Sequence, residues 1–252
     1  MSSTAQPGFD TDLELASRVQ RGLLPKASCC MAAWEIAFSY EAARHVSGDY
    51  LDLVEMGRDS FYFILGDVSG KGVAAALLMA HLHATVRMLL ASGHSLDQII
   101  KETSSTFCQS SLPAQFATLV IGEANRAGKI ELINAGQTPV LFAHDHSTKV
   151  LPATHVPLGL FCGLEADPVS TTVHEQAVPD DILLLYSDGV TETTGEDGSE
   201  YGIERLRDLL SRTALDGPEE TIAAVSTDVR SFSPNSELSD DRSLMALHYR
   251  GA

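Results

Sequence analysis

Residues 60–91, SFYFILGDVSGKGVAAALLMAHLHATVRMLLA, carry the pattern from which the fold class is first inferred. The stretch opens with SFYFIL (60–65), a run of aromatic and β-branched residues that is typical of a strand. A glycine-containing loop, GDVSGKG (66–72), follows the run. Residues 73–91 are rich in alanine, leucine and methionine and contain no helix breaker. The stretch therefore predicts a strand, a tight loop that carries Asp67, and a long helix.

Similar runs lie on both sides of this segment, with turn residues between them. The continuous apolar run ILLLY (182–186) is typical of a strand that is buried on both faces. Strands are predicted at residues 34–41, 50–56, 116–123, 129–134, 139–144, 169–175, 182–186 and 243–249, and helices at 95–110, 203–212 and 218–229. Because strands come in groups and helices in pairs, the order favours an α+β domain of antiparallel sheets flanked by helices.

The N-terminal region is predicted to precede the domain. Residues 1–12 are small and polar, and we expect a disordered N-terminus there. An apolar stripe at every third or fourth residue predicts a helix over residues 13–25 that ends near Gly22 and Pro25. We interpret it as a linker or regulatory helix that docks on the domain, forms a dimer contact or receives a signal. No linker or repeat divides residues 26–252, so we expect one domain there.

The charge balance excludes some classes of partner. The 252 residues include 34 Asp and Glu against 17 Lys and Arg, a net charge of −17. This balance leaves no cationic surface for nucleic acid or for anionic lipid. The longest apolar stretch, residues 73–80, is far shorter than the roughly 20 residues that span a bilayer. We expect a cytoplasmic protein with neither nucleic acid nor membrane as a partner.

The cysteines give no sign of a metal site. Cys29, Cys30, Cys108 and Cys162 form no CxxC pair and have no spacing suited to zinc. We interpret all four as free thiols in a reducing compartment.

Aspartates recur where predicted strands begin or end. They are Asp49 in SGDYLD, Asp67 in ILGDVSGKG, Asp188 in LLLYSDGVTE, and Asp240 with Asp241 in SDDRSLMAL. A carboxylate at the end of a buried strand is held rigidly and can still face a cleft. Several such carboxylates without His or Cys suit Mg²⁺ or Mn²⁺. Each aspartate alone could equally form a turn.

Six motifs in order carry a family resemblance: SGDYLD, GDVSGKGVAAAL, FATLV, NAGQTP, YSDGVTE and DDRSLMAL. Together they resemble the SpoIIE-like, RsbU-type bacterial branch of the metal-dependent protein Ser/Thr phosphatases, the PPM or type 2C superfamily. The resemblance extends from about residue 13 to residue 249 and includes the helix pattern LxxAxxVQxxLLP. It implies an α-β-β-α sandwich, in which two packed antiparallel sheets are flanked by helices and a metal cleft lies at one edge.

The resemblance also implies an activity and its residues. Two Mn²⁺ or Mg²⁺ ions would activate a water for attack on the phosphorus of phosphoserine or phosphothreonine. The implied metal ligands are Asp49, Asp67, the carbonyl of Val68, Asp188 and Asp240, of which Asp67, Asp188 and Asp49 would act in catalysis through the water that the metals bind. Four further residues are implied to shape the surroundings of the metals: Asp241, Ser69, Gly70 and Gly72.

The resemblance suggests partners as well. The implied substrate is a phosphorylated STAS-domain protein, an anti-anti-sigma factor of a partner-switching pathway. An upstream sensor or response regulator is a candidate activator, and the N-terminal helix is a candidate homodimer contact. Two positions depart from the usual pattern: Ser47 stands where many relatives have glycine, and Lys71 stands where histidine is frequent. Neither departure removes an implied ligand.

Other functional interpretations fit the residues less well. A catalytically silent adaptor of the same fold should have lost metal carboxylates, whereas Asp49, Asp67, Asp188 and Asp240 all remain. The loop GDVSGKG lacks the spacing of a nucleotide-binding phosphate loop. We interpret residues 144–146 (HDH) as a polar turn between strands and not as a metal pair.

Overall fold

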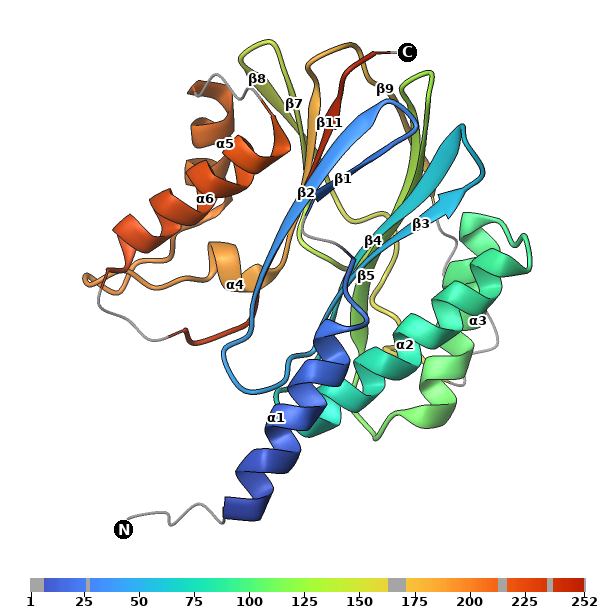
Figure 1. Cartoon of the computed structure of the whole chain (residues 1–252), viewed down its shortest axis with the longest axis vertical. Coiled ribbons are helices and arrows are strands. Elements are labelled where there is room, and N and C mark those ends of the chain that lie inside the picture. The colour runs from blue at the N-terminus through green and yellow to red at the C-terminus, as the bar shows by residue number, and fades with distance from the viewer. Residues whose placement is uncertain (1–6, 26–27, 163–170, 213–216, 235–237, 252) are drawn as a thin grey trace.

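Two antiparallel sheets stack face to face, and helices cover their outer faces (Figure 1). This computed structural model describes residues 7–25, 28–162, 171–212, 217–234 and 238–251. The arrangement confirms the predicted α-β-β-α sandwich.

The six-stranded sheet has the order β1-β2-β11-β10-β7-β8, and all its pairs are antiparallel. Its strands are β1 (Ser28–Met31), β2 (Trp34–Glu41), β7 (Val140–His144), β8 (Ser147–Leu151), β10 (Ile182–Tyr186) and β11 (Arg242–Tyr249). β10 is buried along its whole length, as its apolar run predicted. β11 comes last in the chain yet lies between β2 and β10.

The five-stranded sheet has the order β3-β4-β5-β6-β9. Its strands are β3 (Asp49–Met56), β4 (Ser60–Val68), β5 (Ala117–Asn125), β6 (Lys129–Ala135) and β9 (Val173–Gln176). Large side chains such as Trp34, Phe61, Phe63 and Leu183 fill the space between the two sheets. This central core fixes the sheets relative to each other because interiors are close-packed.

Four of the described helices bury the outer faces of the sheets. The described helices are α1 (Pro7–Arg21), α2 (Val73–Ala91), α3 (Leu96–Ser110), α4 (Asp188–Thr191), α5 (Ile203–Arg212) and α6 (Pro218–Phe232). α2 and α3 pack on the five-stranded sheet, and α5 and α6 pack on the six-stranded sheet. Ser95 begins α3 as its N-cap in a capping box with Gln98.

Among the described helices, α2 alone is long and apolar enough to cross a membrane by length and composition. One face of α2 is buried through Ala75, Met79, Leu82, Val86 and Leu90, in the cluster that includes the five-stranded sheet. We therefore interpret α2 as a core helix of the fold.

Several boundaries differ from the sequence-based expectation. α1 begins at Pro7, so residues 7–12 of the expected disordered N-terminus are helical, and residues 1–6 lie outside the described part. The short strands β1 and β8 were not predicted, because their residues alternate between exposed and half-buried, with only Leu151 at the end of β8 fully buried. The expected strand at 169–175 is described from residue 171 onward and is formed from Val173. Of residues 144–146, His144 ends β7 and is paired with Ser147, while Asp145 and His146 form the hairpin turn to β8.

The interpretation of all four cysteines as free thiols is wrong for two of them. Cys108, near the end of α3, forms a disulfide with Cys162, which lies 54 positions later in the chain. The fold brings their Cα atoms to 5.6 Å, within the range that a disulfide spans. Spacing in the sequence could not show this approach. Cys29 and Cys30 remain thiols.

Candidate metal centre

The strand ends bring the predicted aspartates to one edge of the sandwich. Asp49 begins β3 and is paired in register with Asp67, near the end of β4. Asp188 follows β10, while Asp240 and Asp241 precede β11, the neighbour of β10. Each sheet therefore contributes carboxylates to the same edge.

A hydrogen bond joins the two sheets at this edge. The hydroxyl of Ser243, on β11, donates to Oδ2 of Asp49 at 2.5 Å, and Asp49 is only 1% exposed. The hydroxyl of Ser187 accepts from the backbone N–H of Ser243 at 2.9 Å, which ties the end of β10 to the start of β11. Sequence reasoning missed both serines. The available signal was a serine at the start of the otherwise apolar strand SLMALHY.

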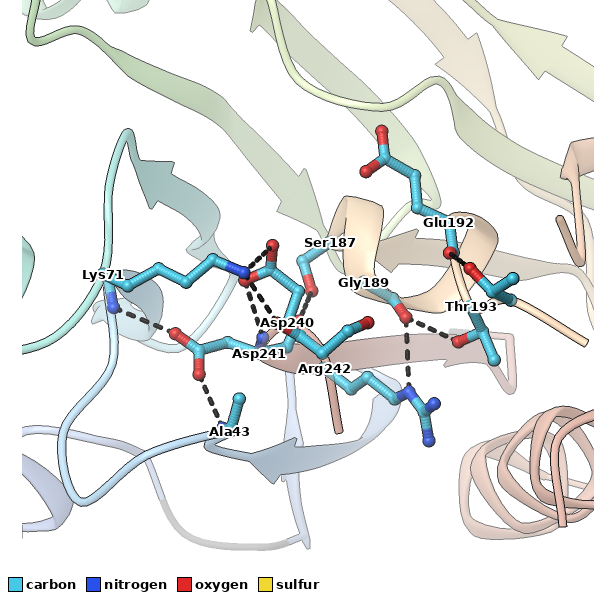
Figure 2. Close-up of polar contacts among 12 residues, drawn as sticks. Ala43, Lys71, Ser187, Gly189, Glu192, Thr193, Asp240, Asp241 and Arg242 are labelled. Carbon is cyan, nitrogen blue, oxygen red and sulfur yellow. Dashed lines mark hydrogen bonds and ion pairs between the residues drawn. The ribbon is translucent and has the colours of Figure 1, made fainter. Parts of the chain in front are cut away.

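Asp241 and Asp240 have different surroundings, although they are adjacent in the chain (Figure 2). Asp241 is buried and accepts from the backbone N–H of Ala43 at 2.7 Å and of Gly48 at 3.2 Å. The side chain of Asp240 is 35% exposed and lies 2.8 Å from Nζ of Lys71. Asp241 therefore holds the loop that leads to β3, while Asp240 faces outward toward a lysine.

Two glycines allow close approach at the edge. A Cβ on Gly48 would lie 2.7 Å from the carbonyl oxygen of Val68 and 3.1 Å from Oδ1 of Asp67. A Cβ on Gly189 would lie 2.1 Å from the carbonyl oxygen of Asp241. Both positions therefore require glycine for steric reasons.

The loop after Asp67 is held in a defined turn. The backbone N–H of Ser69 donates to the carbonyl of Phe116, and the hydroxyl of Ser69 accepts from the N–H of Phe116, both at 2.9 Å. Gly70 and Gly72 have φ angles of +98° and +78°, which favour glycine. The three residues thus position the start of α2 beside Asp67.

Burial and neighbouring charges raise the pKa of three carboxylates at this edge, those of Asp49, Asp67 and Asp188. Burial raises the pKa of Asp67, and the negative charges of Asp49, Asp188 and Asp240 raise it further. Burial also raises the pKa of Asp49, whereas the hydrogen bond from Ser243 lowers it. The pKa of Asp188 is raised by burial and then by the charge of Asp240. Each ionised carboxylate at this edge therefore destabilises the others.

The donor set fits a hard divalent cation. Among the described residues, no three His, Cys, Asp or Glu side chains are already arranged to hold one metal ion. Two of the aspartates have other partners: Asp49 accepts from Ser243, and Asp240 pairs with Lys71. The set nevertheless contains only oxygen donors, and its mutual repulsion is the kind that a divalent cation offsets. Asp49, Asp67, Val68, Asp188 and Asp240 remain the predicted ligands.

The fold, with its two stacked sheets and flanking helices, is that of PP2C domains. The structure is similar to the SiaA-PP2C domain of Pseudomonas aeruginosa, with a TM-score of 0.84, 20% identity and 99% of each chain covered. It is also similar to the RsbU and RsbW domains of a Mycobacterium tuberculosis protein, with a TM-score of 0.74 and 25% identity. That match covers 89% of this chain and 62% of the other.

Within this class, the family model for Stage II sporulation protein E (SpoIIE) matches residues 57–250. The chain belongs to the SpoIIE family, which confirms the resemblance seen in the motifs.

Two curated relatives are similar over most of this chain. Phosphoserine phosphatase RsbU of Bacillus subtilis (strain 168) is 27% identical, and the match covers 77% of this chain and 57% of RsbU. Protein IcfG of Synechocystis sp. is also 27% identical, and the match covers 79% of this chain and 36% of IcfG. The matches therefore span between about a third and slightly more than half of these relatives' lengths.

Proposed function

We propose that this chain is a metal-dependent phosphoprotein phosphatase that hydrolyses phosphoserine or phosphothreonine on a signalling protein. The observation that carries the proposal is the convergence of Asp49, Asp67, Asp188 and Asp240 at one edge of a SpoIIE-family fold. The similarity to RsbU, which is named a phosphoserine phosphatase, supports the same activity.

The proposed chemistry divides between bound metals and the chain's own residues. Two Mn²⁺ or Mg²⁺ ions, held by Asp49, Asp67, the Val68 carbonyl, Asp188 and Asp240, would activate a water and offset charge on the phosphoryl oxygens. Ser243 orients the carboxylate of Asp49 through its 2.5 Å hydrogen bond.

Two backbone contacts keep the parts of the site in place. Asp241 holds the loop before β3 through the N–H groups of Ala43 and Gly48. The N–H of Val68 donates to the carbonyl of Gly48 at 3.3 Å, which keeps the Asp67 loop against the start of β3. Such fixed positioning is what in-line displacement at phosphorus requires.

The substrate we propose is a phosphorylated STAS-domain protein, an anti-anti-sigma factor of a partner-switching pathway. The similarity to RsbU and to a protein with both RsbU and RsbW domains supports this choice. An upstream sensor or response regulator as activator, a homodimer through α1 and a cytoplasmic location also remain proposals. The alternative is a catalytically silent adaptor, and the four retained carboxylates favour the active enzyme.

Hydrolysis of an aryl phosphate in Mn²⁺, Mg²⁺ or EDTA tests the activity, followed by hydrolysis of phosphorylated STAS-domain proteins. We expect turnover that requires metal and that Asp188→Asn lowers by about 100-fold or more, because a carboxylate of the site is lost. Asp145→Asn is the control, since Asp145 is exposed in the β7–β8 turn. A folded protein without turnover on either substrate class in either metal would support the adaptor instead.

Lys71 provides a separate test of Asp240 as a metal ligand. Nζ of Lys71 lies 2.8 Å from Oδ2 of Asp240 and donates to the carbonyl of Ser239 at 2.6 Å. A cation that binds Asp240 must compete with this ammonium group. We therefore expect Lys71→Met to tighten Mn²⁺ binding by about three- to tenfold, measured by titration calorimetry.

The matched control is Lys149→Met, which removes the same charge from an exposed lysine that pairs with Glu175. We expect this control to leave the Mn²⁺ dissociation constant near that of the wild type. Equal Mn²⁺ affinity in the Lys71 variant and in the wild type would argue against Asp240 as a ligand.

A further inference from the structure

A groove of about 890 Å³ opens between α1 and the loop that leads to β3. Its lining includes Glu14, Arg18 and Arg21 from α1, and Ala43, Arg44 and His45 from the loop. Arg18, Arg21, Arg44 and His45 are all exposed. The groove is thus mainly basic, which is a local exception to the expectation, drawn from the net charge of −17, that the chain has no cationic surface.

The groove adjoins the carboxylate edge. The N–H of Ala43, in the groove wall, donates to Oδ1 of Asp241 at 2.7 Å. A Cβ placed on Gly72 would lie 3.7 Å from Nη1 of Arg44, and Gly72 follows Lys71, the partner of Asp240. A peptide whose phosphate lies at the edge can therefore extend into the groove.

The arginines of the groove differ from the other cationic side chains. Within the described part of the chain, Arg18, Arg21 and Arg44 make no hydrogen bond or ion pair with an acidic side chain. Most other cationic side chains do so, including those of Lys71, Arg87, Arg126, Lys129, Lys149, Arg205, Arg207, Arg212, Arg230 and Arg250. Unpaired guanidinium groups bind carboxylates and phosphates through paired N–H donors. The groove therefore has the chemistry to bind an anion.

A buried glutamine fixes the α1 wall of the groove. Gln20 lies in α1 between Arg18 and Arg21, and its Nε2 donates to the carbonyl of Ser47 at 2.7 Å. Its Oε1 accepts from the N–H of Ser47 at 3.0 Å. The hydroxyl of Ser47 in turn accepts from the N–H of Asp49 at 2.9 Å. The part of α1 that carries the two arginines is thus held at a set position relative to a predicted metal ligand, which reduces the entropy cost of binding.

We propose that this groove binds an anionic stretch of the phosphoprotein substrate next to the target phosphoserine or phosphothreonine. The inference rests on the proposed phosphatase function and deepens it. Arg18 and Arg21 determine specificity by pairing with acidic side chains or a second phosphate on the substrate. α1 is then part of the substrate-binding surface.

The test measures how the full chain hydrolyses four substrates, with whichever of Mn²⁺ and Mg²⁺ gives the higher turnover. They are an aryl phosphate and three phosphoserine peptides that differ only beside the target: one has flanking Asp and Glu, one has Asn and Gln, and one has a second phosphoserine. We expect the wild type to prefer an anionic peptide over the neutral one by about tenfold in kcat/KM, through KM. The preference should weaken as salt is added, because exposed charges are screened.

The double variant Arg18→Gln/Arg21→Gln should lose that preference. We expect the ratio of kcat/KM on the anionic peptide to kcat/KM on the aryl phosphate to fall about tenfold, with the change in KM and not in kcat. Arg58→Gln/Arg212→Gln removes two exposed charges elsewhere and is the control. Comparing the acidic and the doubly phosphorylated peptide shows which anion the groove takes.

Three outcomes separate the inference from the function on which it rests. An unchanged ratio in the double variant, or equal losses on every substrate, would overturn the groove as a specificity site. Absence of wild-type turnover on the aryl phosphate and on every peptide would count against the phosphatase function instead. In that case, fluorescence anisotropy of labelled peptides still decides the inference: equal affinity of wild type and double variant for the anionic peptides overturns it.

Discussion

Asp67→Asn is expected to lower metal-dependent hydrolysis by about 1000-fold or more and, at the same time, to stabilise the metal-free protein. The activity would fall because Asp67 is one of the predicted metal ligands, and its carboxylate lies among those of Asp49, Asp188 and Asp240. The stability rises because Asp67 is a largely buried carboxylate surrounded by the charges of Asp49, Asp188 and Asp240. A neutral amide removes that repulsion, with an expected gain of about 1 kcal/mol in the free energy of unfolding in EDTA.

The pH dependence follows from the sign of the pKa shift. Burial and neighbouring charges raise the pKa of Asp67, so the folded metal-free protein binds more protons than the unfolded chain. The contribution of Asp67 therefore becomes less favourable as pH rises from the ordinary aspartate range through the raised pKa. The advantage of the Asp67→Asn variant should grow over this range and vanish in acid.

Urea unfolding in EDTA between about pH 5 and pH 8.5 measures this difference, beside the aryl phosphate assay in Mn²⁺. Asp145→Asn, in the exposed β7–β8 turn, controls for the loss of one negative charge. If the Asp67 variant were less stable than the wild type across the whole range, the repulsion argument would fail.

Gly48→Ala is the second substitution with a large expected effect. The new Cβ would lie 2.7 Å from the carbonyl oxygen of Val68 and 3.3 Å from Cβ of Ala75, so β3 and β4 would have to separate at the carboxylate edge. We expect a loss of about 1–3 kcal/mol in the free energy of unfolding, as overpacking usually causes. Displacement of Asp49 and Asp67 should lower kcat/KM by about 100-fold.

The matched control for this substitution is Gly217→Ala, before α6. Its φ of 176° suits any residue, and the nearest atoms to a new Cβ belong to the flexible side chain of Glu220. Denaturant unfolding and the aryl phosphate assay measure both variants. An active, stable Gly48 variant would show that the edge tolerates a shift of the strands.

Much of the fold follows from local patterns in the sequence. The predicted ranges 34–41, 73–91, 182–186 and 203–212 agree with the structure to the residue, because each is a strong apolar or periodic run between breakers. The topology of the sandwich could be predicted only through the family resemblance, since the place of β11 between β2 and β10 depends on long-range pairing. The same reason explains the missed disulfide between Cys108 and Cys162.

The acidic residues of the candidate site could be predicted from the sequence, but the residues that hold them in place could not. Strand-end aspartates beside glycine could be read from the sequence, and their roles as ligands remain predictions. The contacts of Ser243 with Asp49 and of Gln20 with Ser47 join residues 194 and 27 positions apart. No local signal encodes such contacts, and the arginine groove exists only because α1 packs beside the loop at 43–45.

The central position of β11 also bears on when the protein becomes competent during its synthesis. Asp49 cannot form its hydrogen bond with Ser243 until Ser243, 194 positions later, has been synthesised. A ribosome needs on the order of 10–40 s to add that many residues. Until the last strand is made, β2 and β10 have no common neighbour, and the carboxylates of the two sheets are not brought together. We therefore expect a nascent chain that contains Asp49, Asp67 and Asp188 but lacks β11 to have no assembled site and none of the proposed phosphatase activity.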